Sequence, residues 1–280
     1  MNNKIDLHIH TNRSDGIFSE KEIIDLACDN EIEVISITDH DNIDAASTAA
    51  SYVIGKKITF IPGIEFSIDN SPGELHLLGY GIDFNNSDII AAAASLSADR
   101  ESRAKKIIEE LRSAGIDIEY NEVMNAARSS GSIGKPHIAR MLVEKGYVKR
   151  IDQAFRLYFR NGLPGDVSKK KLSFSEGIKL IGGAGGIPVL AHPGSLHLED
   201  EEYIIKLNEF VNTGLRGVEA YASMHSRRQV RFFEKTALER NLLVTGGSDF
   251  HGDRRERLGY FGKRKINSEK LKNFTDFFGC

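Results

Sequence analysis

The sequence has almost no cysteine and no tryptophan, and the shortage of cysteine excludes two classes of protein. Of its 280 residues only Cys28 and Cys280 are cysteines, so neither a disulfide framework nor a CxxC zinc or redox motif can form. No apolar run approaches the roughly 20 residues of a membrane-spanning helix. The first residues, MNNKIDLHIHT, have no apolar signal-peptide segment, which predicts a cytoplasmic protein.

The chain also has no excess of basic charge. Its formal net charge is −3 and its pI is near 6.3, so no global positive field marks it as a protein that binds duplex DNA. A local site for a short nucleic acid stays open. With 40% hydrophobic and 28% charged residues, the chain can build a large core and is not disordered.

Seven short apolar or β-branched runs are typical of strands, and most of them alternate with helical patterns. Ser19, for example, begins a capping box with Glu22 and opens a helix. This alternation predicts parallel βα units and an α/β fold whose strand count falls one short of an eight-stranded barrel. The predicted strands are residues 4–10, 33–40, 58–68, 74–82, 187–192, 217–222 and 242–251.

The alternation of strand and helix breaks between the fourth and fifth predicted strands. Residues 86–166 contain only helical patterns, so we expect an inserted helical subdomain there. The barrel-like domain then consists of residues 1–85 and 167–280. Within the insertion, helical segments are expected at residues 91–98, 99–113, 121–128, 136–145 and 151–159.

Histidines and carboxylates gather where the predicted strands end. Six of the nine histidines lie at or near such positions, and the carboxyl ends of parallel strands meet on one face of a barrel. Core packing does not call for such a cluster, whereas a divalent zinc, manganese or iron ion does. The side chains are His8, His10, His40, Glu65, His76, His192, Asp249 and His251.

The spacing within two pairs strengthens the prediction of a metal site. His8 and His10 are two residues apart in a strand, so both imidazoles face the same side. The same holds for Asp249 and His251. These pairs lie on the first and last predicted strands, which would be neighbours in a closed barrel.

Several residues keep two interpretations at this stage. Asp15, in the loop NRSDG, is either a turn-forming residue or a ligand, and Asp39 is either a ligand or a group that orients an imidazole. For Glu219 we favour a hydrogen-bonding role over a ligand role. The glycine-rich residues 182–186 precede a strand, so they indicate a helix end rather than a phosphate loop, and residues 169–171 (KKK) are most typical of a solvated loop.

The motifs together resemble those of a known family of metalloenzymes. DLHIHT, SDG, TDHD, GIE, ELHLLGY, AHPG and GSDFHG follow one another between Asp6 and Gly252. In this order they resemble the PHP (polymerase and histidinol phosphatase) family of metallophosphoesterases. The resemblance implies a distorted seven-stranded (β/α)7 barrel with an inserted helical subdomain, three divalent metal ions and hydrolysis of a phosphomonoester.

The resemblance also implies a role for each ligand. The metal is expected to be manganese, with zinc or iron also compatible, and a hydroxide bridging two metals would attack phosphorus. His8, His10, Glu65 and Asp249 would hold the first metal, Glu65 would bridge to a second completed by His76 and His192, and Asp15, His40 and His251 would hold the third.

The helical insertion resembles one branch of the family, which includes 3′,5′-nucleoside bisphosphate phosphatases and a 5′-to-3′ exoribonuclease acting on short RNA. RESRAKKIIEEL, IGKPHIARMLVEKG and GGIPVLAHPG carry this resemblance. It implies a small phosphorylated nucleotide or a short single-stranded RNA as partner, with no membrane and no duplex DNA. The candidates for gripping a second phosphate or a base are Arg100, Arg103, Lys135, His137 and Arg140, and His225 is the candidate acid for the leaving oxygen.

Two alternatives to this function remain open from the sequence. Histidinol-phosphate phosphatase activity occurs in the same family, and the long insertion argues against it. A structural domain that has lost its ligands is the non-enzymatic alternative, and the nine filled ligand positions argue against that.

Overall fold

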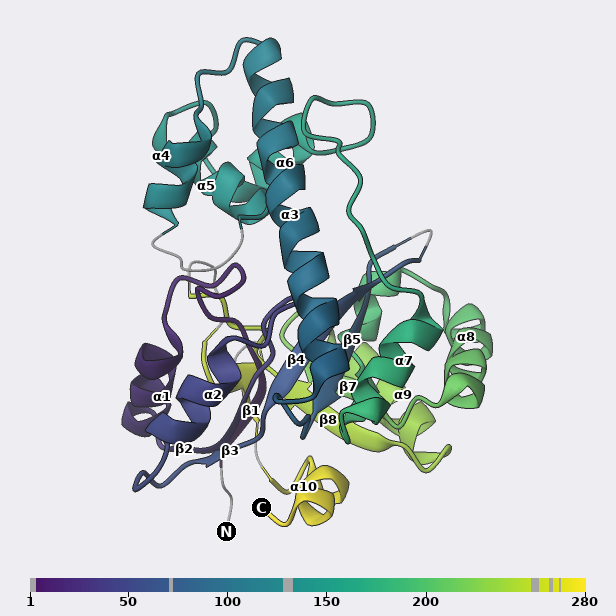
Figure 1. Cartoon of the computed structure of the whole chain (residues 1–280). Helices are drawn as coiled ribbons and strands as arrows, with labels where there is room; N and C mark the ends of the chain where they lie inside the picture. Colours follow the sequence, from purple (N-terminus) through teal and green to yellow (C-terminus); the bar gives the residue numbers. More distant parts are fainter. Residues whose placement is uncertain (1–3, 71–72, 128–132, 253–256, 262–263, 267) are drawn as a thin grey trace.

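The computed structural model describes residues 4–70, 73–127, 133–252, 257–261, 264–266 and 268–280. Figure 1 shows strands flanked by helices in the lower part of the molecule and a group of helices in the upper part. The long helix α3 (Ser87–Ser113) runs from the lower part into the upper part. None of the helices in the described ranges could carry the chain through a lipid bilayer.

The strands form a three-stranded sheet, a five-stranded sheet and a separate two-stranded ribbon. The smaller sheet, β1-β2-β3, is parallel throughout. In the larger sheet, β4-β5-β6-β7-β8, strand β5 is antiparallel to both of its neighbours and β6, β7 and β8 are parallel. The strands are β1 (Lys4–Ile9), β2 (Ile32–Ile37), β3 (Thr59–Phe60), β4 (Gly63–Ile68), β5 (Leu75–Tyr80), β6 (Ile187–Leu190), β7 (Gly217–Ala222) and β8 (Leu243–Gly247), with β9 (Tyr260–Phe261) and β10 (Arg264–Lys265) in the ribbon.

The two larger sheets meet at two single bridges. Ile9 pairs with Phe250 at one seam, and His40 pairs with Glu65 at the other. The second seam is reinforced by the amide of Asp41, which donates to the carbonyl of Glu65 at 2.9 Å. Side chains from both sheets share one apolar core, but their strands do not form a continuous hydrogen-bonded cylinder.

The distorted seven-stranded (β/α)7 barrel that the sequence predicted is therefore not confirmed, because the described sheets do not close into one barrel, although the α/β class is right. The fourth predicted strand is β5, which follows β4 after a short connection. A parallel pair needs a crossover of about a dozen residues or more, so a connection this short joins antiparallel strands. The reversal places the first residues of β5, including His76, beside the carboxyl end of β6.

Helices cover the outer faces of both sheets (Figure 1). α1 and α2 pack on the three-stranded sheet, and α7, α8 and α9 pack on the five-stranded one. Ser19, Ser173 and Ser226 each begin one of these helices with a capping box, as expected for Ser19. The bounds are α1 (Glu20–Asp29), α2 (Ala45–Tyr52), α7 (Phe174–Gly183), the 3-10 helix η1 (Pro193–Leu196), α8 (Asp200–Thr213), α9 (Arg227–Leu238) and α10 (Lys272–Phe278).

The upper part contains the second half of α3 together with α4 (Tyr120–Ala126), α5 (Lys135–Glu144) and α6 (Ile151–Tyr158). Its apolar side chains, such as Leu111 and Leu142, form a core separate from the main one. The first half of α3 packs on the main core through Ile89 and Leu96. The single helix α3 thus replaces the two helices expected at residues 91–98 and 99–113, and it joins both cores. The division into domains at residues 86 and 167 stays a prediction.

Substitution of Gly247, the last residue of β8, tests how closely β8 approaches β1. A Cβ at this position would overlap the amide nitrogen and Cβ of His8. We expect Gly247→Ala to lower the free energy of unfolding by about 1–3 kcal/mol, as overpacking does, in urea denaturation. Gly182→Ala in α7 is the control, because a Cβ there meets no atom within 4 Å. Equal stability of Gly247→Ala and the wild type would contradict this close approach.

Candidate metal centre

All nine side chains predicted as ligands come together where the strands end. Their ligand atoms form four overlapping groups, and within each group the atoms lie within 4.8 Å of one another. Assigning these side chains to metals stays a proposal, argued below. The groups are His8–His10–Asp249, His8–Glu65–His192, His40–Glu65–His76 and His10–Asp15–His40–His251.

Glu65 of β4 lies at the centre of the cluster and is fully buried. Burial alone would raise the pKa of this carboxyl group, but the imidazoles around it hold the pKa well below its usual value. Glu65 is therefore an anion shared among five rings. His192 and His76 lie 3.0 and 3.1 Å from its Oε1, and His40, His8 and His10 lie 2.9, 3.4 and 3.4 Å from its Oε2.

Two buried atoms of this cluster face each other without a hydrogen bond. Nδ1 of His40 and Oε2 of Glu65 lie 2.9 Å apart, yet neither has a hydrogen-bond partner within the described part of the chain. Leaving a buried polar atom unpaired costs about 1–3 kcal/mol. A divalent cation would supply the missing partner for both atoms, since imidazole nitrogen and carboxylate oxygen are donors it accepts.

The hydrogen bonding of His8 agrees with a cation at this place. Glu219 Oε1 lies 2.9 Å from Nδ1 of His8, so a proton on that nitrogen is held by a carboxylate and Nε2 is the atom that would bind a cation. Nε2 faces Nε2 of His10 at 3.1 Å and Asp249 Oδ1 at 3.6 Å. Glu219 thus has the hydrogen-bonding role that the sequence favoured.

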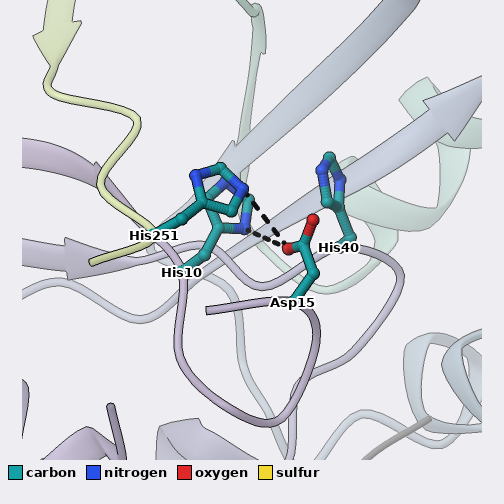
Figure 2. Close-up of side chains that lie close together, drawn as sticks. All are labelled: His10, Asp15, His40 and His251. Carbon is teal, nitrogen blue, oxygen red and sulfur yellow. Dashed lines mark ion pairs between the residues drawn. The ribbon is translucent and has the colours of Figure 1, made fainter. Parts of the chain in front are cut away.

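His10, Asp15, His40 and His251 form one side of the cluster (Figure 2). Figure 2 shows the carboxylate of Asp15 directed at His10 and His251. Asp15 Oδ1 lies 3.4 Å from Nε2 of His251 and 3.8 Å from Nδ1 of His10. Asp15, for which the sequence left a turn or a ligand open, therefore lies among the predicted ligands.

Asp39 orients this side of the cluster and belongs to none of the four ligand groups. Its carboxylate accepts hydrogen bonds from the amide and hydroxyl of Thr11 at 2.7 and 2.6 Å, and from the hydroxyl of Ser14 at 2.6 Å. These bonds tie the loop that carries Asp15 to the end of β2. The sequence left open a ligand or a group that orients an imidazole, whereas these bonds show Asp39 positioning the loop through Thr11 and Ser14.

Asp6 has a similar role that sequence reasoning missed. It accepts from the amide and hydroxyl of Ser248 at 2.9 and 2.6 Å and from the amide of Gly259 at 2.7 Å. The segment that carries Asp249 and His251 is thereby tied to β1. The motif DLHIHT contained the signal, because Asp6 precedes His8 by two residues and points to the same side of the strand.

The backbone at this edge is strained at two predicted ligands. His192 and Asp249 have φ angles of 23° and 55°, in the left-handed region that costs about 1–3 kcal/mol for a residue with a side chain. At His192 the strain is offset by Glu219, whose Oε2 accepts the His192 amide at 2.7 Å. Such strain persists where surrounding contacts fix a functional geometry.

His225 does not fit the role of leaving-group acid that the sequence suggested. Its Nδ1 donates to the carbonyl of Ala220 at 2.9 Å, and its Nε2 accepts from the amide of Gly194 at 3.1 Å. Burial lowers the pKa of His225, which favours this neutral form. Both ring nitrogens thus bind backbone groups, and the ring fastens the turn after β6 to β7.

Two of the basic residues predicted to bind substrate contact the loops of the metal cluster. Nη2 of Arg100 donates to Oδ2 of Asp41 at 3.0 Å, and the Arg100 side chain is almost completely buried. Nη2 of Arg140 donates to the carbonyl oxygen of Asp15 at 2.6 Å. These arginines connect the insertion to the loops of the metal cluster.

The other three candidates lie in or beside α3 and α5. His137 is 3% exposed and accepts the amide at the start of its own helix. Arg103 and Lys135 are half-buried and donate to the carbonyls of Val167 and Phe159 at 2.8 and 3.2 Å. Burial lowers the pKa of Lys135 to about 8, and the positive charge of Arg103 acts in the same direction.

The interpretation of residues 169–171 as a solvated loop is wrong for Lys169. Its side chain is 18% exposed, and its Nζ lies 2.7 Å from Oδ2 of Asp41. Asp41 was not predicted as a functional residue either. The signal was the second acidic residue of TDHD, which follows the ligand candidate His40, but nothing local in the sequence identified its distant partners.

Comparison with known proteins shows to which family the chain belongs. The sequence model of the PHP domain family matches residues 6–162 of this chain. A 3′,5′-nucleoside bisphosphate phosphatase of Chromobacterium violaceum is 32% identical over 247 residues, which are 88% of this chain and 87% of the relative. A 5′-3′ exoribonuclease of Haemophilus influenzae is 32% identical over 254 residues, which are 90% of this chain and 91% of the relative.

Solved structures share the fold. One from C. violaceum, described as an amidohydrolase with bound sulfate, has a TM-score of 0.85 and 31% identity, and the match covers 92% of this chain and 90% of the other. The fold, the cluster and these relatives define a metal-dependent phosphoesterase, a hydrolase of ester bonds. The chain belongs to the PHP family.

Glu219→Gln tests whether Glu219 orients a metal ligand. We expect this change to weaken Mn²⁺ binding about 10–100-fold in calorimetric titration, because an amide holds the Nδ1 proton of His8 less firmly than a carboxylate does. Glu239→Gln is the control, since Glu239 lies at the end of α9 and is 54% exposed. If Glu219→Gln bound Mn²⁺ as the wild type does, Glu219 would have no orienting role.

Proposed function

We propose that this enzyme removes a phosphate from a 3′,5′-nucleoside bisphosphate, leaving a nucleoside monophosphate, and that it also acts on the 5′ ends of short oligoribonucleotides. The observation that carries the proposal is the cluster around Glu65, with basic residues of the insertion beside it. The C. violaceum and H. influenzae relatives support it, because their names state these two activities and they match most of this chain.

We assign the nine side chains to three divalent cations, with manganese as the expected metal. The two oxygens of Glu65 face different imidazoles, which favours Glu65 as the ligand shared by two cations. Bound there, the cations supply an activated water nucleophile and neutralise charge on the phosphoryl oxygens. In this assignment His8, His10, Glu65 and Asp249 would hold the first, Glu65, His76 and His192 would hold the second, and Asp15, His40 and His251 would hold the third.

Arg103 and Lys135 are the residues we assign to the second phosphate or the base of the substrate. They come from different helices of the insertion, and burial together with the positive charge of Arg103 lowers the pKa of Lys135. A partly desolvated guanidinium and ammonium bind a phosphate through charge-assisted hydrogen bonds. The insertion, residues 86–166, would then cover the substrate.

The cytoplasmic location expected from the sequence stays a prediction.

Histidinol phosphate remains the second candidate substrate, and the helical insertion argues against it. An insertion that carries two half-buried cations suits a substrate with a second anionic group, which histidinol phosphate lacks. The alternative of a structural domain required lost ligands, whereas all nine ligand positions are filled and lie together.

Steady-state phosphate release tests the substrate. With Mn²⁺, we expect kcat/KM for adenosine 3′,5′-bisphosphate to exceed that for adenosine 5′-monophosphate and for histidinol phosphate by about tenfold or more. A 5′-phosphorylated pentaribonucleotide should be shortened stepwise from its 5′ end. A higher kcat/KM for histidinol phosphate would overturn the proposal.

The variant Arg103→Ala separates the second phosphate from the reacting one. We expect KM for the bisphosphate to rise about 10–100-fold, the loss of one charge-assisted contact, with little change for the monophosphate. Lys105→Ala is the control, because Lys105 is an exposed residue of the same helix that pairs with Glu101. Equal effects of Arg103→Ala on both substrates would remove the assigned role.

The lowered pKa of Lys135 predicts a pH dependence of substrate binding. With a pKa of about 8 the amine is charged at neutral pH and loses its proton as the pH rises through that value. KM for the bisphosphate should therefore rise between about pH 7 and 9 in the wild type, whereas Lys135→Arg should keep KM nearly constant because arginine stays charged. Identical profiles of the two proteins would show that Lys135 does not contact the substrate.

A further inference from the structure

The two connections between the insertion and the sheets behave as one structural unit. α3 leads out of the main core, and residues 167–172 lead back and pair with the end of β4. Arg103 of α3 donates to the carbonyl of Val167 at 2.8 Å, and Asp99 of α3 accepts the amide of Lys170 at 3.0 Å. A displacement of one connection therefore moves the other.

Asp41 binds both connections. Its carboxylate is 1% exposed, and its Oδ2 lies 3.0 Å from Nη2 of Arg100 and 2.7 Å from Nζ of Lys169. Ser67 of β4 also donates to this carboxylate, through its amide at 2.8 Å and its hydroxyl at 3.1 Å. Because Asp41 directly follows His40, the position of the insertion is coupled to the backbone of a metal-ligand candidate.

A second contact joins the insertion to the same side of the cluster. Arg140 of α5 donates to the carbonyl oxygen of Asp15 at 2.6 Å, a short hydrogen bond strengthened by the charge of the guanidinium. The carboxylate of the same Asp15 points at His10 and His251 (Figure 2). The insertion thus holds the main chain of the ligand candidate Asp15. It also holds Asp41, the residue that follows the ligand candidate His40.

Asp15 and His40 belong to the same group of possible ligands, His10–Asp15–His40–His251. We propose that docking of the insertion and metal binding by this group are coupled, so that each stabilises the other. The inference rests on the metal assignment of the proposed function. Metal binding needs Asp15 and His40 in fixed positions, and the contacts of Asp41 and Arg140 favour those same positions; such coupling is reciprocal.

The coupling would make substrate binding depend on the occupancy of this one metal site. Arg103 and Lys135, which we assign to the substrate, are carried by the insertion. When the His10–Asp15–His40–His251 group is empty, the insertion would dock less firmly and these two cations would be less well placed. The metal bound by this group would in this way control the affinity for a nucleotide.

The experiment breaks both contacts in the full-length protein. The double variant Arg100→Met, Arg140→Met removes the two guanidinium groups and leaves Lys169 to neutralise Asp41. Arg112→Met is the control, because Arg112 lies farther along α3, is 55% exposed and pairs with Glu119. Hydrogen–deuterium exchange of α5 and α6 is measured with and without Mn²⁺, and Mn²⁺ binding is measured by calorimetric titration.

In the wild type and the control, we expect Mn²⁺ to slow exchange in α5 and α6. In the double variant most of this protection should disappear, and one class of Mn²⁺ sites should weaken about 5–150-fold while the others keep their affinity. A melting temperature in chelator close to that of the wild type would show that the double variant is folded. The single variant Arg140→Lys should retain more of the coupling than the double variant does, because it keeps Arg100 and a charged donor at position 140.

Two results would overturn the coupling. One is Mn²⁺-dependent protection equal to that of the wild type in the double variant, and the other is a uniform weakening of all Mn²⁺ sites. Neither measurement uses a substrate, so a protein that showed the coupling but released no phosphate from nucleotides would refute the proposed substrate alone. Absence of Mn²⁺ binding in the wild type would refute the metal assignment and the coupling together.

Discussion

A fully buried carboxylate surrounded by five imidazole rings is the constraint on which the rest of this structure depends. Lone pairs of nitrogen and oxygen that face one another inside a protein repel, and cations between them turn that repulsion into binding. The six side chains involved come from both larger sheets and the loops that follow their strands. The fold can therefore be understood as the frame that holds donors from distant parts of the chain at ligand distances.

The frame achieves this with buried carboxylates that bind no metal in our assignment. Asp6, Asp39 and Glu219 each accept hydrogen bonds from the backbone of a segment that carries a ligand candidate. Charged acceptors are the strong partners for buried amides, and Glu219 also offsets the left-handed backbone at His192. The strained positions of this edge thus coincide with the chemistry, which is where a locally unfavourable conformation is expected.

The insertion shows how one residue type serves two purposes. Arg100, Arg103 and Arg140 all belong to helices of residues 86–166, and their sequence contexts do not distinguish them. The structure does distinguish them, because Arg100 pairs with the buried carboxylate of Asp41 and Arg140 with the carbonyl of Asp15 beside the cluster. Arg103 instead donates to the carbonyl of Val167 and is half-buried beside Lys135. Arginines that the sequence could not tell apart thus separate into two groups. Arg100 and Arg140 connect the insertion to the loops of the cluster, and Arg103 is a candidate for binding substrate.

Much of the site follows from local sequence alone. The two-residue spacing of His8 and His10 aims both rings at one side of a strand, and the position of ligands at strand ends predicts that they meet, because these features depend only on neighbours along the chain. The α/β class and the helical insertion follow in the same way from hydrophobic periodicity.

Long-range packing decided the rest. The reversal of β5, the burial of Lys169 against Asp41 and the capture of both nitrogens of His225 each depend on groups far away in the sequence. A pattern of residue types carries no record of which distant charge or amide a side chain will meet, so these contacts exist only once the chain is folded. The kinds of candidate ligand were therefore determined by the sequence, and the partners that position them were decided by the tertiary structure.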